Sequence, residues 1–117
     1  MKKILITVFA VLLLCSVVVS AQDKREILKI DFLISSVENL NGAKFIRNNS
    51  EYSGKEAAEH LRMKLNNVGN KVQTAEDFIR LCASKSYISG KPYMIRTSDG
   101  KTIKSEDYFR EKLREYR

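Results

Sequence analysis

Histidine, cysteine, proline and tryptophan are scarce in this chain of 117 residues, which contains one His, two Cys, one Pro and no Trp. A zinc site needs three or four His, Cys or carboxylate ligands at suitable spacing, and the sequence has neither H-E-x-x-H nor C-x-x-C. It also lacks a glycine-rich phosphate loop and a G-x-S-x-G nucleophile motif. We therefore expect no metal and no cofactor, and we assign no catalytic residue from a motif.

Long apolar runs are confined to the start of the chain. Two lysines precede an apolar run at residues 4–19, and the small residue Ala21 follows it. A basic start, an apolar middle and a small residue before the cut are typical of a secretory signal peptide. We predict cleavage between Ala21 and Gln22. Residues 1–21 are then removed, and residues 22–117 form one small globular domain.

Two other interpretations of the leader stay open. An uncleaved membrane anchor needs about 20 apolar residues, and this run is shorter. A lipoprotein would be lipidated at Cys15, but the residue before such a cysteine is small, whereas here it is Leu14. Cleavage leaves no stable membrane anchor and implies a periplasmic or secreted protein. It also leaves Cys82 without an internal disulfide partner, which favours a buried thiol.

The net charge is positive but mixed in sign. Without Lys2 and Lys3, the 21 basic residues fall by two against 14 acidic residues, which leaves a net charge of +5. Basic and acidic side chains alternate along the predicted helices, as on solvated helix faces, whereas a nucleic-acid surface concentrates like charge. We therefore expect no nucleic-acid partner. The expected partner is a peptide, a cell-envelope component or another protein, with a bias toward anionic ones.

The spacing of apolar residues predicts four helices. The first covers residues 26–41. Capping boxes begin the second helix at Ser53 and the third at Thr74, and Ser105 begins the last. The expected inner faces include Leu33, Ile34 and Val37 in the first helix, Ala58, Leu61 and Leu65 in the second, Phe78, Ile79 and Cys82 in the third, and Phe109, Leu113 and Tyr116 in the fourth.

Extended segments complete the predicted fold. Residues 44–48 contain Phe45-Ile46 and are too short for a helix. Residues 93–97 and 101–104 flank Asp99-Gly100, which is a hairpin signal because Gly accepts a positive φ. The sequence therefore predicts a helix-dominated α+β domain of four helices with a small antiparallel hairpin, or a three-stranded sheet if the hairpin pairs with Phe45-Ile46.

The second helix carries the most informative polar side chains. Glu56, His60 and Lys64 lie on one flank at four-residue spacing, with His60 and Lys64 at the border of the apolar stripe. A glutamate one turn before a histidine can accept the ring N–H and orient the imidazole. His60 is thus either a ligand-binding imidazole at the edge of a groove or a hydrogen-bonded residue at the edge of the core.

Short motifs follow one another in a specific order along the chain, namely Phe45-Ile46-Arg47-Asn48, Tyr52, Glu56-Ala57, His60-Leu61-Arg62, Lys64, Thr74-Ala75-Glu76-Asp77-Phe78-Ile79, Ala83-Ser84 and Ser89-Gly90-Lys91-Pro92-Tyr93. Together they resemble the YfeK-like family, a domain-of-unknown-function group of small exported bacterial proteins. The resemblance implies a bacterial secretory signal, a periplasmic or secreted location and no established activity. The chain departs from the family pattern at Asn49, where relatives tend to have Gly, and at Tyr87, in a loop that relatives fill with Ser.

The same motifs define a tentative ligand site. If they converge, a polar cleft forms between the second helix and residues 89–93, and Arg47 pairs there either with Glu56 or with a ligand carboxylate. The alternative is an internal network that holds the extended segment to the helices. The candidate residues are Arg47, Asn48, Tyr52, Glu56, His60, Arg62, Ser84, Ser86, Ser89, Gly90 and Tyr93.

Three functional hypotheses follow from these observations. The first is a non-catalytic exported domain that binds a peptide, an envelope component or another protein. The alternative is a small hydrolase or transferase that uses His60 as the base, with Glu56 orienting it. The third is a redox role for Cys82, which requires an accessible thiol.

Export predicts a shortened mature chain. Mass spectrometry of the accumulated protein should show a chain that begins at Gln22, because the signal peptidase cuts after the small residue Ala21. A product that still begins at Met1, or a protein found wholly in the cytosol on fractionation, would contradict the export prediction.

Overall fold

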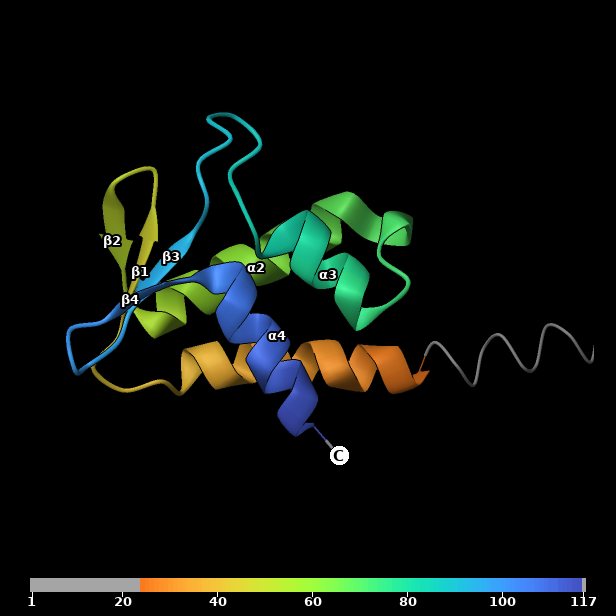
Figure 1. The fold of residues 1–117 in the computed structure, drawn as a ribbon. Helices are drawn as coiled ribbons and strands as arrows, with labels where there is room; N and C mark the ends of the chain where they lie inside the picture. The colour runs from red at the N-terminus through yellow and green to blue at the C-terminus, as the bar shows by residue number, and fades with distance from the viewer. Residues whose placement is uncertain (1–23, 117) are drawn as a thin grey trace, which may run out of the picture.

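A computed structural model describes residues 24–116 of the chain. The predicted signal peptide, residues 1–21, and its cleavage site lie outside the described residues. Within the described part, four α-helices surround one end of a four-stranded antiparallel sheet, which confirms the α+β class and the predominance of helix (Figure 1). No helix of this part is long and apolar enough to cross a bilayer.

The helices occur close to where the apolar spacing predicted them, but the first ends at residue 38 and not at the predicted Asn41. The first covers residues 24–38 in the described part of the chain, and we refer to it as helix 24–38. The others are α2 at Gly54–Val68, α3 at Ala75–Cys82 and α4 at Ser105–Glu115, with a short 3-10 turn, η1, at Gly69–Lys71.

Capping explains where these helices begin. Ser53 and Glu56 form the predicted capping box of α2, and Thr74 and Asp77 form that of α3. The helix α4 begins at Ser105, as predicted, with Glu106 and Asp107 in its first turn, but its N-cap is Lys104 and no side chain caps the helix. The backbone N–H of Ser105 donates to the carbonyl oxygen of Tyr93 at 2.9 Å. A backbone carbonyl just before β3 therefore satisfies one of the free donors at the start of α4.

The sheet has one strand more than the sequence predicted. The strands are β1 (Lys44–Arg47), β2 (Ser50–Tyr52), β3 (Met94–Arg96) and β4 (Thr102–Lys104), in the order β2-β1-β3-β4. The hairpin β3–β4 is confirmed, and so is its pairing with Phe45-Ile46. The analysis missed β2, which the turn at Asn48-Asn49 folds back onto β1.

This turn has a backbone that few residues adopt. Asn48 and Asn49 have φ of 49° and 68°, and Arg47 pairs directly with Ser50. A two-residue turn with positive φ at both positions matches the right-handed twist of the strands, and Asn tolerates it better than most side chains. Asn48 and Asn49 therefore supply the backbone geometry that this turn requires.

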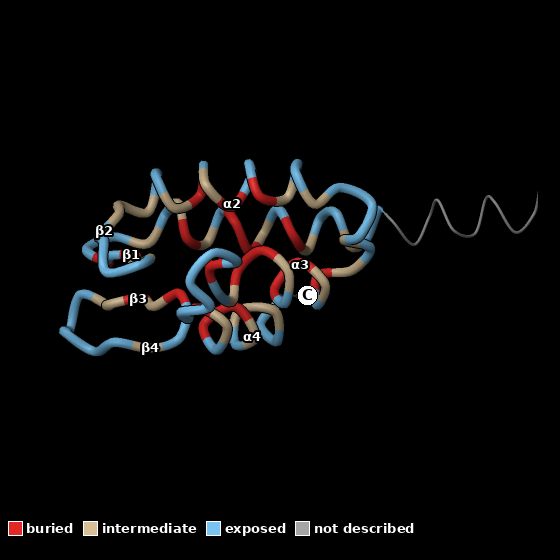
Figure 2. The backbone as a smooth tube through the Cα atoms, turned by 90° about the horizontal axis from the view of Figure 1, so that it is seen from above, coloured by how far each residue is buried: buried red, intermediate tan, exposed pale blue. Residues whose placement is uncertain are grey.

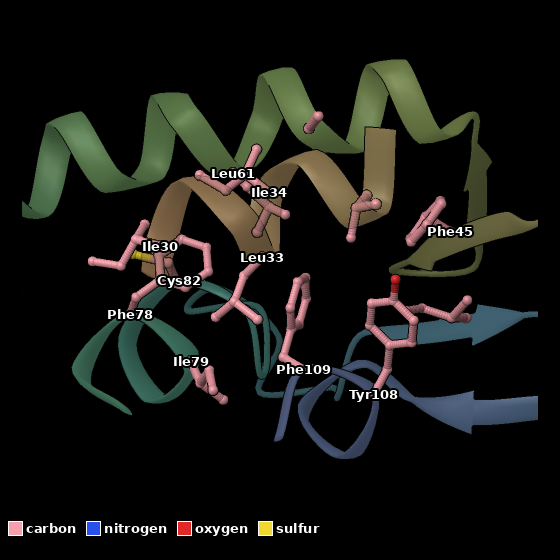
Figure 3. Close-up of a cluster of buried hydrophobic side chains, with 14 of the residues drawn as sticks. Ile30, Leu33, Ile34, Phe45, Leu61, Phe78, Ile79, Cys82, Tyr108 and Phe109 are labelled. Atoms are coloured by element: carbon pink, nitrogen blue, oxygen red, sulfur yellow. The ribbon is translucent and has the colours of Figure 1, made fainter. Parts of the chain in front are cut away.

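The apolar faces of all four helices meet in one core. Helix 24–38 lies between α2 on one side and α3 and α4 on the other, with Leu33 and Ile34 pointing into the shared interior (Figure 3). Buried residues follow the inward side of each helix, while the outward side of α2 is exposed (Figure 2). In α4 the inner face includes Phe109 as predicted, together with Tyr108, which the sequence analysis missed. The Tyr108 hydroxyl donates to Ser36 Oγ at 3.0 Å, so this phenol is buried with a partner.

Gly54 is required because two helices approach closely there. A Cβ at Gly54 would lie 2.5 Å from the carbonyl oxygen of Val37 and 3.3 Å from that of Glu38. We expect Gly54→Ala to destabilise the fold by about 1–3 kcal/mol, because the backbone of helix 24–38 must move. Thermal unfolding measures the change as a fall of several degrees in Tm.

The sign of this effect is diagnostic. Helix propensity alone would make Gly54→Ala stabilising by up to about 1 kcal/mol. An unchanged or raised Tm would therefore show that the close approach does not exist. Lys55→Ala, at the next and exposed position of α2, is the matched control and should leave the Tm nearly unchanged.

Candidate ligand-binding cleft

A cleft of about 370 Å³ opens between α2, the inner side of the sheet and the start of α4. This volume lies within the range of small-molecule sites in proteins. Apolar and aromatic side chains form most of its walls, and a few polar groups stand among them. The lining includes Phe45, Arg47, Tyr52, Glu56, Ala57, Glu59, His60, Leu61, Met63, Tyr93 and Phe109.

Arg47 and His60 form the polar centre of the cleft. Nη1 of Arg47 lies 2.9 Å from Nε2 and 3.1 Å from Nδ1 of the imidazole. A guanidinium has only donors, so whichever ring nitrogen accepts from Arg47 carries no proton. This contact therefore favours the neutral imidazole.

The surroundings of His60 favour the neutral ring as well. Burial lowers the pKa of His60 below its usual value of 6.5, and the positive charges of Arg47 and Lys64 lower it further. The edge of the ring faces Tyr93, with ring centroids 6.2 Å apart. At neutral pH, Arg47 and Lys64 are the cations beside the ring, and the ring itself adds no charge.

Arg47 binds only neutral partners among the described residues. Besides His60, its Nη2 donates to the Tyr52 hydroxyl at 3.3 Å, and its guanidinium carbon lies 5.3 Å from the centroid of the Tyr52 ring. No ion pair of Arg47 is formed within residues 24–116. The predicted pairing of Arg47 with Glu56 is therefore not what the structure shows.

Glu56 has a structural partner instead. Its Oε1 accepts from the backbone N–H of Ser53 at 3.0 Å, which closes the capping box and lowers the pKa of the carboxyl group. The four-residue spacing places Glu56 on the same flank as His60, as predicted, but the hydrogen bond runs to the helix start. The hypothesis of a His60 base oriented by Glu56 loses its geometric basis in the described residues.

Lys64 is a buried residue that the sequence analysis left out of the site. Only 9% of it is exposed, and its Nζ donates to the Tyr93 hydroxyl at 2.9 Å and to the carbonyl oxygen of Lys85 at 3.2 Å. The ammonium also lies over two aromatic rings, 4.3 Å from the centroid of Tyr87 and 4.8 Å from that of Tyr93. The signal in the sequence was that Lys64 follows His60 by four residues, which places both side chains on one flank of α2.

Part of the predicted polar set forms a separate network. Asn48 Nδ2 donates to Ser86 Oγ at 3.3 Å, and Ser89 Oγ donates to Asn48 Oδ1. Gly90 has φ of 73°, and its N–H donates to the Ser86 carbonyl at 2.9 Å. These bonds fasten the loop between α3 and β3 to the β1–β2 turn. None of these four residues lines the cleft.

Ser84 and Arg62 serve other contacts. Ser84 Oγ donates to the carbonyl oxygen of Ile79 at 2.6 Å, near the end of α3. Arg62 Nη2 forms an ion pair with Glu38 at 3.0 Å, which joins α2 to helix 24–38. Of the predicted residues, the cleft brings together Arg47, Tyr52, Glu56, His60 and Tyr93, whereas Asn48, Arg62, Ser84, Ser86, Ser89 and Gly90 lie outside its lining.

Cys82 lies in the core. Its side chain has no exposed surface, and burial raises the pKa of the thiol. This confirms the buried thiol and removes the accessibility that the redox hypothesis requires. Among residues 24–116, no group of three or more His, Cys, Asp or Glu side chains that could hold a metal lies together.

Comparison with known proteins places the chain in a family. The family described as "Family of unknown function (DUF5329)" matches residues 24–117. The chain belongs to this family. It is also 38% identical over 93 residues to "Uncharacterized protein YfeK" of Salmonella typhimurium (strain LT2), a match that covers 80% of this chain and 77% of the relative. No solved structure matches. These matches confirm the YfeK-like resemblance of the motifs.

The sole histidine reports directly on the cleft. We expect a proton NMR titration to give a His60 pKa below 6.5, because burial, Arg47 and Lys64 disfavour the charged ring. Arg47→Gln should raise this pKa, and Arg62→Gln, on the same helix as His60 but outside the cleft, should leave it unchanged. Equal values for Arg47→Gln and the unmodified protein would contradict the contact.

The same shift sets a pH dependence of stability. His60 binds its proton less readily in the folded than in the unfolded chain. The free energy of unfolding is therefore lower at acidic pH. It falls as the pH drops through the pKa of His60 in the unfolded chain, near 6.5, and it stops falling once the pH is below the pKa of His60 in the folded chain.

Proposed function

We propose that the protein is an exported, non-catalytic binding domain, and that the cleft between α2 and the sheet is its binding site. The observation that carries the proposal is the cleft itself, about 370 Å³ of mainly apolar walls around Arg47. A concave apolar site with a few convergent polar groups is the usual form of a ligand site.

The state of His60 supports binding over catalysis. A general base needs a free lone pair and a pKa near the working pH. Arg47 Nη1 lies within hydrogen-bonding distance of both ring nitrogens of His60, and the pKa of the ring is lowered. Glu56 is held by Ser53. No observation in the described residues favours the hydrolase or transferase alternative.

The leader supports the exported location. The basic start and apolar run precede a small residue at the predicted cut, and the resemblance of the motifs to the YfeK-like family implies export as well. Export to the periplasm or the medium would expose the cleft to peptides, envelope components and other proteins.

Binding of a neutral apolar probe tests the cleft. The purified protein should bind N-phenyl-1-naphthylamine saturably at one site, with a rise in probe fluorescence. Ala57→Phe should weaken this binding at least tenfold, since the new ring fills space in the cleft. Asn66→Phe places the same ring at an exposed position of α2 and is the matched control.

A second variant covers the case in which Ala57→Phe does not fold. Met63 lines the cleft and is 56% exposed, so Met63→Gln removes an apolar wall with little risk to the core. It should weaken probe binding several-fold. Absence of saturable binding, or binding unaffected by both cleft variants, would refute the proposed site.

A further inference from the structure

We propose that the cleft binds a ligand with an apolar body and a terminal carboxylate, and that Arg47 is the residue that binds the carboxylate. This inference deepens the proposed binding function and rests on it. The carboxylate belongs either to the free C-terminus of a peptide that ends in an apolar residue or to a small organic acid, and the recognition chemistry is the same for both.

Arg47 differs from the other paired arginines in what it contacts. Its partners in the described residues are a neutral imidazole, a phenol and an aromatic ring. A carboxylate accepts two parallel N–H bonds from a guanidinium, which are stronger than bonds to neutral acceptors. The arginines that form ion pairs with carboxylates in residues 24–116 are Arg62, Arg80, Arg96, Arg110 and Arg114.

Two cations lie in or next to the cleft without a carboxylate partner among the described residues. Lys64 does not line the cleft but contacts Tyr93, which does, and its ammonium is held by a carbonyl oxygen, a phenol and two rings. The charges of both Arg47 and Lys64 reach the imidazole of His60, since both act on its protonation. A ligand anion beside Arg47 would therefore lie in a positive field that the protein itself does not neutralise there.

The carboxylates in the lining do not fill this role. Glu56 is bonded to the backbone of Ser53, at the start of α2. Glu59 is exposed and lies one turn before Met63 along the helix. A ligand anion would thus approach Arg47 past one exposed carboxylate, which disfavours a ligand with a second negative charge.

The remaining walls suit an apolar group. Phe45, Leu61 and Phe109 are core residues that also line the cleft, and Met63 is an exposed apolar residue of the lining. An apolar group of a ligand placed there would move out of water and contact side chains that are themselves shielded from water. The charge of Arg47 and the apolar walls together fix the orientation of the ligand.

Two ligands that differ only in charge test the inference. 4-Phenylbutyrate should displace N-phenyl-1-naphthylamine about tenfold more tightly than 4-phenylbutanamide, because only the carboxylate forms charge-assisted bonds. 4-Phenylbutylamine should bind more weakly than either. To distinguish the two sources, the peptide Ala-Ala-Phe with a free C-terminus is compared with its C-terminal amide and with 4-phenylbutyrate.

Variants assign the preference to Arg47. Arg47→Gln should abolish the difference between acid and amide, whereas Arg47→Lys should retain part of it as a charge without the planar fork. Arg62→Gln is the matched control and should keep the full preference, because Arg62 pairs with Glu38 outside the cleft. Glu59→Gln should leave the affinity for the acid unchanged or raise it.

The single histidine gives a readout that a merely structural role would not change. In the unmodified protein, 4-phenylbutyrate should raise the pKa of His60, since an anion beside the ring favours its charged form, and the amide should not. This measurement needs no variant to fold.

The outcomes separate the two proposals. Equal affinity for acid and amide, tighter binding of the amine, or no displacement of a bound probe would overturn the carboxylate inference and leave the cleft as a neutral binding site. A probe that does not bind saturably would overturn the proposed function together with the inference. If 4-phenylbutyrate shifts the pKa of His60 but the Arg47→Gln variant keeps the full preference for acid over amide, Arg47 is not the residue that binds the carboxylate.

Discussion

The burial of one face of helix 24–38 is the constraint on which the rest of the structure depends. Leu33 and Val37 have no exposed surface, and the cluster around them takes residues from α2, α3, α4 and the inner side of the sheet. Because this helix is covered from both sides, α2 is held where Gly54 touches its last turn. The flank of α2 that carries His60 then faces the sheet across the cleft. The position of the site therefore follows from the packing of the core elements and not from any one polar contact.

Charge in the cleft is arranged differently from charge on the surface. On the helix surfaces, acidic and basic side chains lie within ion-pair distance of each other, and such exposed pairs contribute little to stability. In and next to the cleft, Arg47 and Lys64 are satisfied by phenols, a carbonyl oxygen and aromatic rings, which hold a cation without cancelling its charge. Neutral partners therefore keep the site positive, and this field adds to burial in lowering the pKa of His60.

The loop between α3 and β3 contacts both the β1–β2 turn and α2. Figure 1 shows it extending away from the helices, and Ile88 at its tip is 97% exposed. Its base is nevertheless fixed, because Asn48 binds Ser86 from the sheet side and Lys64 lies against the ring of Tyr87 from the helix side. The ring of Tyr87 lies against the ammonium of the buried Lys64. The polar network predicted from the motifs exists in this loop, but it is distinct from the cleft.

The sequence alone determined the features that depend on neighbours along the chain. The apolar periodicity gave the four helices, the capping residues gave two of their starts, and Asp99-Gly100 gave the hairpin, since a few consecutive residues settle each of these. Only the tertiary structure decided which of two local roles a side chain takes. Glu56 could reach either His60 or Ser53, and Arg47 could reach either a carboxylate or the imidazole, because spacing along a helix fixes a direction and not the partner that another element brings into it. The burial of Lys64 belongs to the same class, since its partners Lys85 and Tyr93 lie far away in the sequence. The strand β2, by contrast, pairs with β1 across a two-residue turn, so this hairpin is local although it was not predicted.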